Sequence, residues 1–188
     1  MNLNEIAHLT AEYGDGWGLP HVQRLLKLVE RIDSGISYDH EALAYAVYLH
    51  DWGAFTHFRR AGVDHGLRSR QIVEEEILPH TALTTAQKKI VLDAIEYHDY
   101  RCVLPAWTQE AVLLREADFL DFLGVIGFAR EFAWSTNQMQ AAEERILTRR
   151  EALRERFTLP AAQQIAAERL DRMEKVLAWL QEESLGSL

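Results

Sequence analysis

The chain has 188 residues, of which 48% are hydrophobic and 26% charged. This length favours one domain with a single core, and the composition excludes a disordered chain. Its 20 basic and 29 acidic residues give a net charge of −9, which argues against a protein that neutralises the phosphates of a nucleic-acid duplex.

Apolar residues recur at three- and four-residue spacing along most of the chain, the pattern of helices with one buried face. A first helix is expected over residues 21–32, after the glycine-rich segment 14–18. A second is expected to start at Ser37 or Asp39, both good N-cap residues, and to end at Gly53.

Two further helices have recognisable starts. Asp64 is the expected N-cap of a third helix, which Pro79 should stop. The spacing of Thr84 and Gln87 is that of a capping box, and the helix it starts is expected to run to His98.

The remainder of the chain is also expected to be helical. One helix should start at Thr108, another should span residues 124–132, and the charged stretch 143–155 has the opposite charges of a solvated helix. A last helix opens around Pro160. No alternation typical of strands is present, so the sequence predicts an all-α, compact single-domain bundle of about six to eight helices.

The one cysteine, Cys102, rules out an intrachain disulfide and a thiolate-rich zinc site. The N-terminal residues 1–5 lack the features of a signal peptide, and no apolar run approaches the roughly 20 residues of a membrane span. We therefore expect a cytoplasmic protein that does not bind a membrane.

The most informative residues are the adjacent pair His50 and Asp51, which stand where the apolar stretch 42–49 runs into Gly53. Burying such groups without partners costs several kcal/mol, and a divalent cation would supply the missing partner. Neighbouring helical residues point about 100° apart, so the two side chains can converge only where the helix ends.

Four other possible ligands each lie near the end of a separate predicted helix: His21, His65, His98 and Asp118. Inward-facing side chains from different helices are the usual way to build a metal site in a bundle. Because all donors are nitrogen or oxygen, the set suits Mn, Fe, Ni, Co or Zn, and Mg less well.

The order His, His-Asp, His, His, Asp resembles the HD superfamily of metal-dependent phosphohydrolases, and especially its small stand-alone bacterial members. The resemblance covers nearly the whole chain. The segments that carry it are PHVQRLL (20–26), YLHDWG (48–53), DHGLRS (64–69), AIEYH (94–98) and EADFLDFLG (116–124).

The resemblance implies a single HD domain over residues 1–188, with a metal-site core at about 20–125 and C-terminal helices 137–184 packed on it. It implies hydrolysis of a phosphoester of a small molecule, with a nucleotide expected, by metal-activated water. Asp121 is expected to orient a ligand or transfer a proton. The implied ligands are His21, His50, Asp51 and Asp118 for one ion. If a second ion is bound, as in some family members, His65 and His98 hold it and Asp51 bridges the two.

Two departures leave the substrate open. Ala54 follows Gly53 where several phosphodiesterase branches have lysine, and Asp99 follows His98 where related proteins often have serine. Arginine binds phosphate through two parallel hydrogen bonds, so nearby arginines are candidate substrate contacts. These are Arg24, Arg59, Arg60, Arg68 and Arg101.

Other interpretations remain open at this point. His50 and Asp51 could form a buried hydrogen-bonded pair without a metal, and His65 and His98 could be ordinary core histidines. The missing lysine at Ala54 leaves room for a scaffold that senses a nucleotide without turnover. A minority HD branch contains di-iron oxygenases, which gives a second alternative function. Separately, the exposed aromatic residues are compatible with a homodimer.

Overall fold

The computed structural model describes residues 1–102, 104–135 and 137–188. Within these ranges the chain forms nine α-helices and no β-strand, which confirms the all-α prediction. None of these helices combines the length and the apolarity that a bilayer span requires. Two compact units are present, Met1–Ala117 and Asp118–Leu188.

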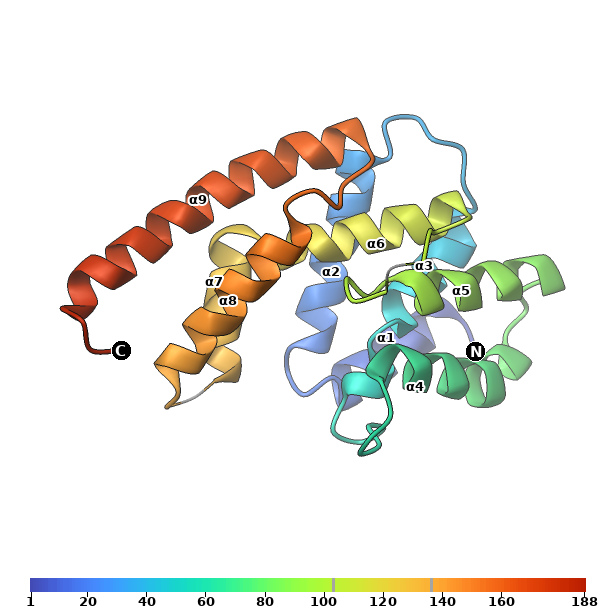
Figure 1. The fold of residues 1–188 in the computed structure, drawn as a ribbon. Helices are drawn as coiled ribbons and strands as arrows, with labels where there is room; N and C mark the ends of the chain where they lie inside the picture. The colour runs from blue at the N-terminus through green and yellow to red at the C-terminus, as the bar shows by residue number, and fades with distance from the viewer. Residues whose placement is uncertain (103, 136) are drawn as a thin grey trace. The chain divides into compact units, whose positions relative to one another are not determined.

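The first unit contains five complete helices and most of a sixth (Figure 1). They are α1 (Leu3–Tyr13), α2 (Gly18–Ile32), α3 (His40–Leu49), α4 (His65–Ile72), α5 (Thr85–Tyr97) and α6 (Gln109–Asp121). Helix α3 packs against α1, α2 and α5, and six of its residues are buried. It is therefore the central element of this unit.

Hydrogen bonds that side chains accept from backbone N–H groups confirm three predicted helix starts. Asp39 caps α3 by accepting a backbone N–H at 2.9 Å, and Asp64 caps α4 by accepting two, at 2.9 and 3.2 Å. Thr84 and Gln87 form the predicted capping box at the start of α5. Each cap satisfies a backbone donor that has no partner within the helix.

Helix α1 is the element that the sequence analysis missed. A capping box starts it, because the side chains of Asn2 and Glu5 each accept the other's backbone N–H, at 3.0 and 2.7 Å. The Trp52 indole N–H donates to the buried Thr10 hydroxyl at 3.1 Å, which joins α1 to the segment after His50 and Asp51. The pattern Asn-x-x-Glu was a usable signal for this start.

The helix expected between Asp64 and Pro79 is not one continuous α-helix. Helix α4 ends at Ile72, a π-helical turn follows over Val73–Ile77, and a 3₁₀ turn over Leu78–His80 contains Pro79. Proline lacks a backbone N–H, and the hydrogen-bond pattern changes before it is reached.

Gly53 does not end α3 as predicted, because α3 stops at Leu49. Gly53 lies in the 3₁₀-helix Trp52–Ala54, which packs against α4, and its N–H donates to the Ser69 hydroxyl at 2.8 Å. A Cβ at this position would overlap the backbone carbonyl oxygen of His65 and lie 2.6 Å from the Ser69 nitrogen. The missing side chain lets α4 approach closely, and α4 carries His65.

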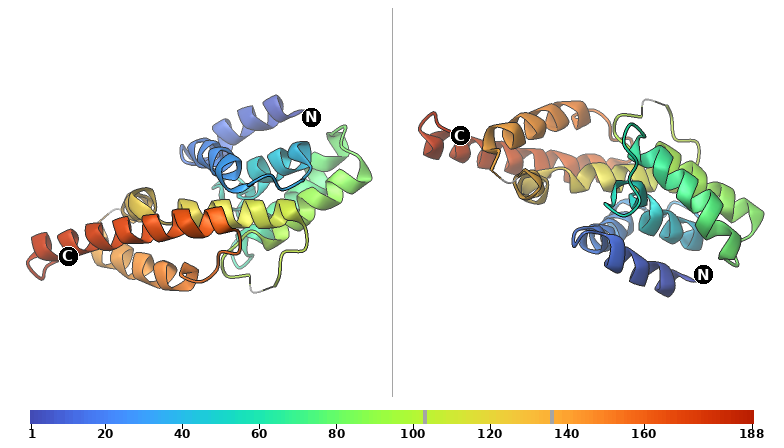
Figure 2. Two further views of the ribbon diagram at one scale, coloured as in Figure 1. Left: turned by 90° about the horizontal axis from the view of Figure 1, so that it is seen from above. Right: turned by 90° about the horizontal axis from the view of Figure 1, so that it is seen from below.

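The second unit contains α7 (Gly124–Trp134), α8 (Met139–Leu153) and α9 (Pro160–Ser184), with α7 packed against both others (Figure 2). The charged stretch 143–155, predicted as a solvated helix, belongs to α8 up to Leu153, but not all of it faces water. Arg145 donates to the buried Glu131 of α7 at 2.9 Å, and Arg149 pairs with the other oxygen of that carboxylate. These ion pairs join α7 to α8.

The close approach at Gly53 yields a stability prediction. Gly53→Ala should lower the free energy of unfolding by about 1–3 kcal/mol, because the added methyl group must push α4 away. Urea unfolding followed by circular dichroism measures this change. An unfolding midpoint equal to that of the unmodified protein would show that the approach of α4 does not limit the side chain at position 53.

Candidate metal centre

His50 and Asp51 converge because the α-helix ends between them. The backbone N–H of His50 still donates to Ala46 at 2.9 Å, so His50 is the C-cap of α3, whereas Asp51 has left the helix. The imidazole is fully buried and the carboxylate is 15% exposed. Their Nε2 and Oδ2 atoms lie 3.4 Å apart, which confirms the predicted convergence at a helix end.

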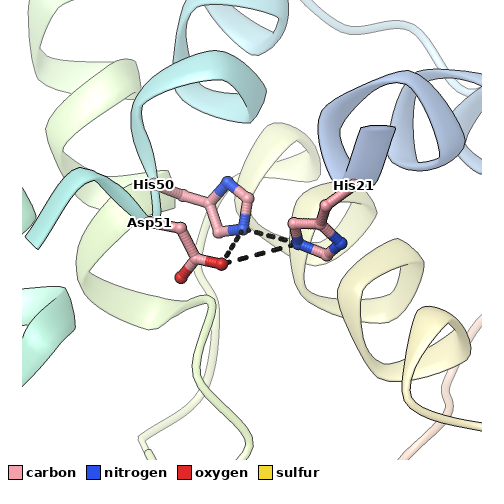
Figure 3. A group of neighbouring side chains, drawn as sticks. All are labelled: His21, His50 and Asp51. Carbon is pink, nitrogen blue, oxygen red and sulfur yellow. Dashed lines mark hydrogen bonds and ion pairs between the residues drawn. The ribbon is translucent and has the colours of Figure 1, made fainter. Parts of the chain in front are cut away.

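His21 reaches this pair from α2 (Figure 3). Its Nε2 lies 3.2 Å from Nε2 of His50 and 3.6 Å from Oδ2 of Asp51. The His21 side chain is buried, and the three residues could together hold a metal ion. We call them the first group.

His65 and His98 approach the same carboxylate with their own donors. His65 is the first residue of α4, and His98 is the C-cap of α5. Their Nε2 atoms are 3.2 Å apart, and they lie 3.4 and 3.7 Å from Oδ1 of Asp51. Asp51 therefore directs one oxygen to the first group and the other to this second group, which consists of Asp51, His65 and His98.

The separations within both groups fit shared metal ligation. Donors about 2.0–2.1 Å from one ion lie roughly 3.0–3.4 Å apart at bond angles of about 90–109°. The donor atoms here are 3.2–3.7 Å apart before any ion draws them together. Imidazole nitrogen and carboxylate oxygen suit first-row divalent cations, so the residues fit one ion or two.

Backbone carbonyls orient two of the imidazoles for ligation. Nδ1 of His50 lies 2.8 Å from the carbonyl oxygen of Val47, and Nδ1 of His98 lies 2.6 Å from that of Ile95. A carbonyl oxygen only accepts, so both Nδ1 atoms carry hydrogen and, in the neutral rings, both Nε2 atoms have a lone pair. This is the arrangement that metal-bound histidines adopt.

The electrostatics of the cluster favour an ionised Asp51. Burial alone would raise the pKa of Asp51, but the imidazoles of His50, His65 and His98 that face the carboxylate hold it well below its usual range. Burial lowers the pKa of His65, whereas Asp51, Asp99 and Asp64 together raise it to about 9. An anionic carboxylate thus stands among four imidazoles.

Three residues around His65 extend the site beyond what was expected. Oδ2 of Asp99 lies 3.4 Å from Nε2 of His65, and Oδ2 of Asp64 lies 3.8 Å from its Nδ1. Arg101, a predicted phosphate contact, places Nη2 3.0 Å from the same Nδ1. The sequence analysis had named Asp64 only as a helix cap and Asp99 only as a departure, although Asp99 directly follows His98.

Asp118 and Asp121 lie in the last turn of α6, and both are buried. Asp121 accepts a hydrogen bond from Nη1 of Arg130 at 2.6 Å, within the second unit. The role of Asp118 as a ligand, and that of Asp121 in orientation or proton transfer, stay predictions.

The other predicted arginines differ in their surroundings. Arg68 is buried and donates from Nε to the carbonyl of Phe58 at 3.0 Å, which ties the loop after the His-Asp pair to α4. Arg59 and Arg60 are exposed in that loop, and Arg24 is partly buried on α2. Their contacts with substrate stay predictions.

Comparison with solved structures identifies the fold. No protein-family model matches this sequence, and no curated protein does. A predicted HD superfamily hydrolase from an uncultured Thermotogales bacterium is 22% identical with a TM-score of 0.64, over 95% of this chain and 89% of that one. An HD-superfamily hydrolase from Bacillus thuringiensis is also 22% identical, with a TM-score of 0.64 over 98% and 95% of the two chains.

Bacillus subtilis YpgQ, whose structure was solved in complex with ADP, is 18% identical with a TM-score of 0.72, over 98% of this chain and 95% of that chain. The chain therefore has the helical fold of HD-superfamily hydrolases, as its motifs indicated. At sequence identities of 18–22%, the similarity to these structures is evidence for the fold alone.

The bridging position of Asp51 predicts that one substitution disables both groups. Asp51→Asn should lower the affinity for Mn²⁺ at least about 100-fold, because it removes the charge and the second anionic oxygen. Isothermal titration calorimetry measures the loss. Asp39→Asn is the matched control, since asparagine also caps a helix well. Full metal binding by Asp51→Asn would contradict the bridging role.

The raised pKa of His65 predicts that metal binding depends on pH. Below about pH 9 His65 is protonated on both ring nitrogens, and an ion at the second group must displace the proton of Nε2. Affinity for that ion should therefore rise between pH 6 and pH 9, with about one proton released per ion at pH 7.5. Calorimetry in two buffers of different ionisation enthalpy counts the protons, and a count of zero would contradict this prediction.

Proposed function

We propose that this protein is a metal-dependent phosphohydrolase that acts on a phosphoester of a small molecule, a nucleotide in particular. The observation that carries the proposal is the Asp51 carboxylate, with its two oxygens 3.4–3.7 Å from two pairs of imidazoles. The likeness to HD-superfamily hydrolases supports the same chemistry.

Each group of the chain has a definite part in this proposal. Asp51, His21 and His50 hold one divalent ion, with Asp118 as a further ligand, and His65 and His98 hold a second. Such an ion lowers the pKa of its bound water to about 7 and neutralises charge that develops on the phosphoryl oxygens. The hydrogen bonds of His50 and His98 to backbone carbonyls keep their rings in place.

Nearby arginines would bind and orient the phosphate. Arg24 follows His21 by one helical turn, so both residues lie on the same side of α2. Arg59 and Arg60 stand in the loop that Arg68 ties to α4. The nucleotide is favoured because YpgQ, with the same fold, binds ADP.

The proposal is tested with purified protein supplied with Mn²⁺ and a panel of nucleoside mono-, di- and triphosphates and p-nitrophenyl phosphate. We expect turnover of at least one substrate, and its loss, by about 10³-fold or more, in the double variant His50→Ala, Asp51→Asn. His8→Ala is the matched control, since His8 is exposed on α1, outside the cluster.

The other outcomes discriminate between the functions that the sequence left open. A nucleotide that raises the melting temperature without turnover would identify a sensor in place of a hydrolase. Oxygen consumption with iron would identify an oxygenase. Full phosphatase activity in the double variant would place the chemistry elsewhere.

A further inference from the structure

His65 differs from His50 and His98 in what its outward ring nitrogen contacts. The other two donate from Nδ1 to backbone carbonyls, at 2.8 and 2.6 Å. Nδ1 of His65 instead lies 3.0 Å from Nη2 of Arg101, and 3.8 Å from Asp64, beyond hydrogen-bond distance. A guanidinium has donors and no acceptor. The second group therefore contains a histidine whose Nδ1 faces a donor, whereas Nδ1 of His50 in the first group faces a carbonyl oxygen.

This contact conflicts with metal ligation by His65. A neutral imidazole that binds an ion through Nε2 carries its hydrogen on Nδ1. That Nδ1–H would then point at an N–H group of Arg101, and two donors cannot form a hydrogen bond with each other. When a neutral His65 accepts from Arg101 at Nδ1, its hydrogen is on Nε2, which lies 3.2 Å from Nε2 of His98 and 3.4 Å from carboxylate oxygens of Asp51 and Asp99. A protonated ring carries a hydrogen on both nitrogens, so its Nδ1–H also faces Arg101. Either way, Arg101 has to leave Nδ1 before an ion binds His65.

Arg101 is held at this position by two carboxylates. Its Nε and Nη2 donate to the two oxygens of Asp99 at 2.9 and 2.6 Å, and Nη2 also lies 3.1 Å from Asp64. The backbone N–H of Arg101 donates to Asp99 as well, at 2.7 Å. Displacing the guanidinium from His65 therefore works against a set of charge-assisted hydrogen bonds.

We propose that Arg101 is a positioning residue that weakens the second metal group, so that the first group fills first and the second ion binds only after Arg101 moves away from His65. This inference rests on the proposed metal centre. It assigns a weaker metal affinity of the second group to the contact between Arg101 and His65. The first group, which contains His21, His50 and Asp51, does not depend on that contact.

The test compares Mn²⁺ binding by the unmodified protein and the variants Arg101→Met and Arg70→Met, with stoichiometry and affinity from calorimetry and free Mn²⁺ from electron paramagnetic resonance. Methionine keeps much of the length of arginine and removes its donors. Arg70 is the matched control, because it lines the same hollow of about 350 Å³ as Arg101 but pairs with Glu96, at 2.9 Å.

We expect two sites in the unmodified protein, with the second weaker. Arg101→Met should tighten the second site about tenfold, in line with the effects of residues that contact metal ligands. Arg70→Met should change the affinity of the second site less than about threefold. This control distinguishes loss of the contact between Arg101 and His65 from the mere loss of a nearby positive charge. The affinity of the first site should be the same in all three proteins.

Three results would overturn the proposal: a second site that Arg101→Met leaves unchanged or weakens, equal tightening in both variants, or equal affinity of both sites in the unmodified protein. Arg101 has a side chain 55% exposed, and melting temperatures check that each variant is folded. Absence of any Mn²⁺ binding would instead refute the metal centre itself, so the two failures are distinguishable.

Discussion

The site depends on one carboxylate that is shared between two pairs of imidazoles. Oδ2 of Asp51 faces His21 and His50, and Oδ1 faces His65 and His98. In each pair of imidazoles the facing Nε2 atoms lie 3.2 Å apart, so two neutral rings can share only one hydrogen between these nitrogens. The carboxylate lies between the two pairs, and in the proposed metal centre a cation would give the facing nitrogens a shared partner. The four histidines come from the first turns of α2 and α4 and from the C-caps of α3 and α5.

Helix ends provide that convergence and also the orientation of the ligands. His50 and His98 each follow a helix directly, and the last carbonyls of a helix have no N–H partner within it. The carbonyls of Val47 and Ile95 accept Nδ1–H of the histidine three residues later. The same geometry thus completes the helix and aims Nε2 at the site. Gly53 contributes by letting α4, and His65 with it, approach the segment after α3.

Much of this could be predicted from sequence, because local patterns carry it. The caps at Asp39, Asp64 and Thr84 depend on neighbouring residues, and the histidines predicted near helix ends do lie there. The end of α3 was misplaced, because the need for glycine at position 53 comes from α4, which is distant in sequence. The contacts of Arg101 with His65 and Asp64 were invisible for the same reason. The pattern Asn2-x-x-Glu5 was present but not used.

The most direct test of the shared carboxylate is anomalous X-ray diffraction from crystals soaked in saturating Mn²⁺. Two manganese peaks should flank Asp51, one beside His21 and His50 and the other beside His65 and His98, with each carboxylate oxygen bound to a different ion. Manganese bound away from these imidazoles, or a crystal without manganese at Asp51, would contradict the account.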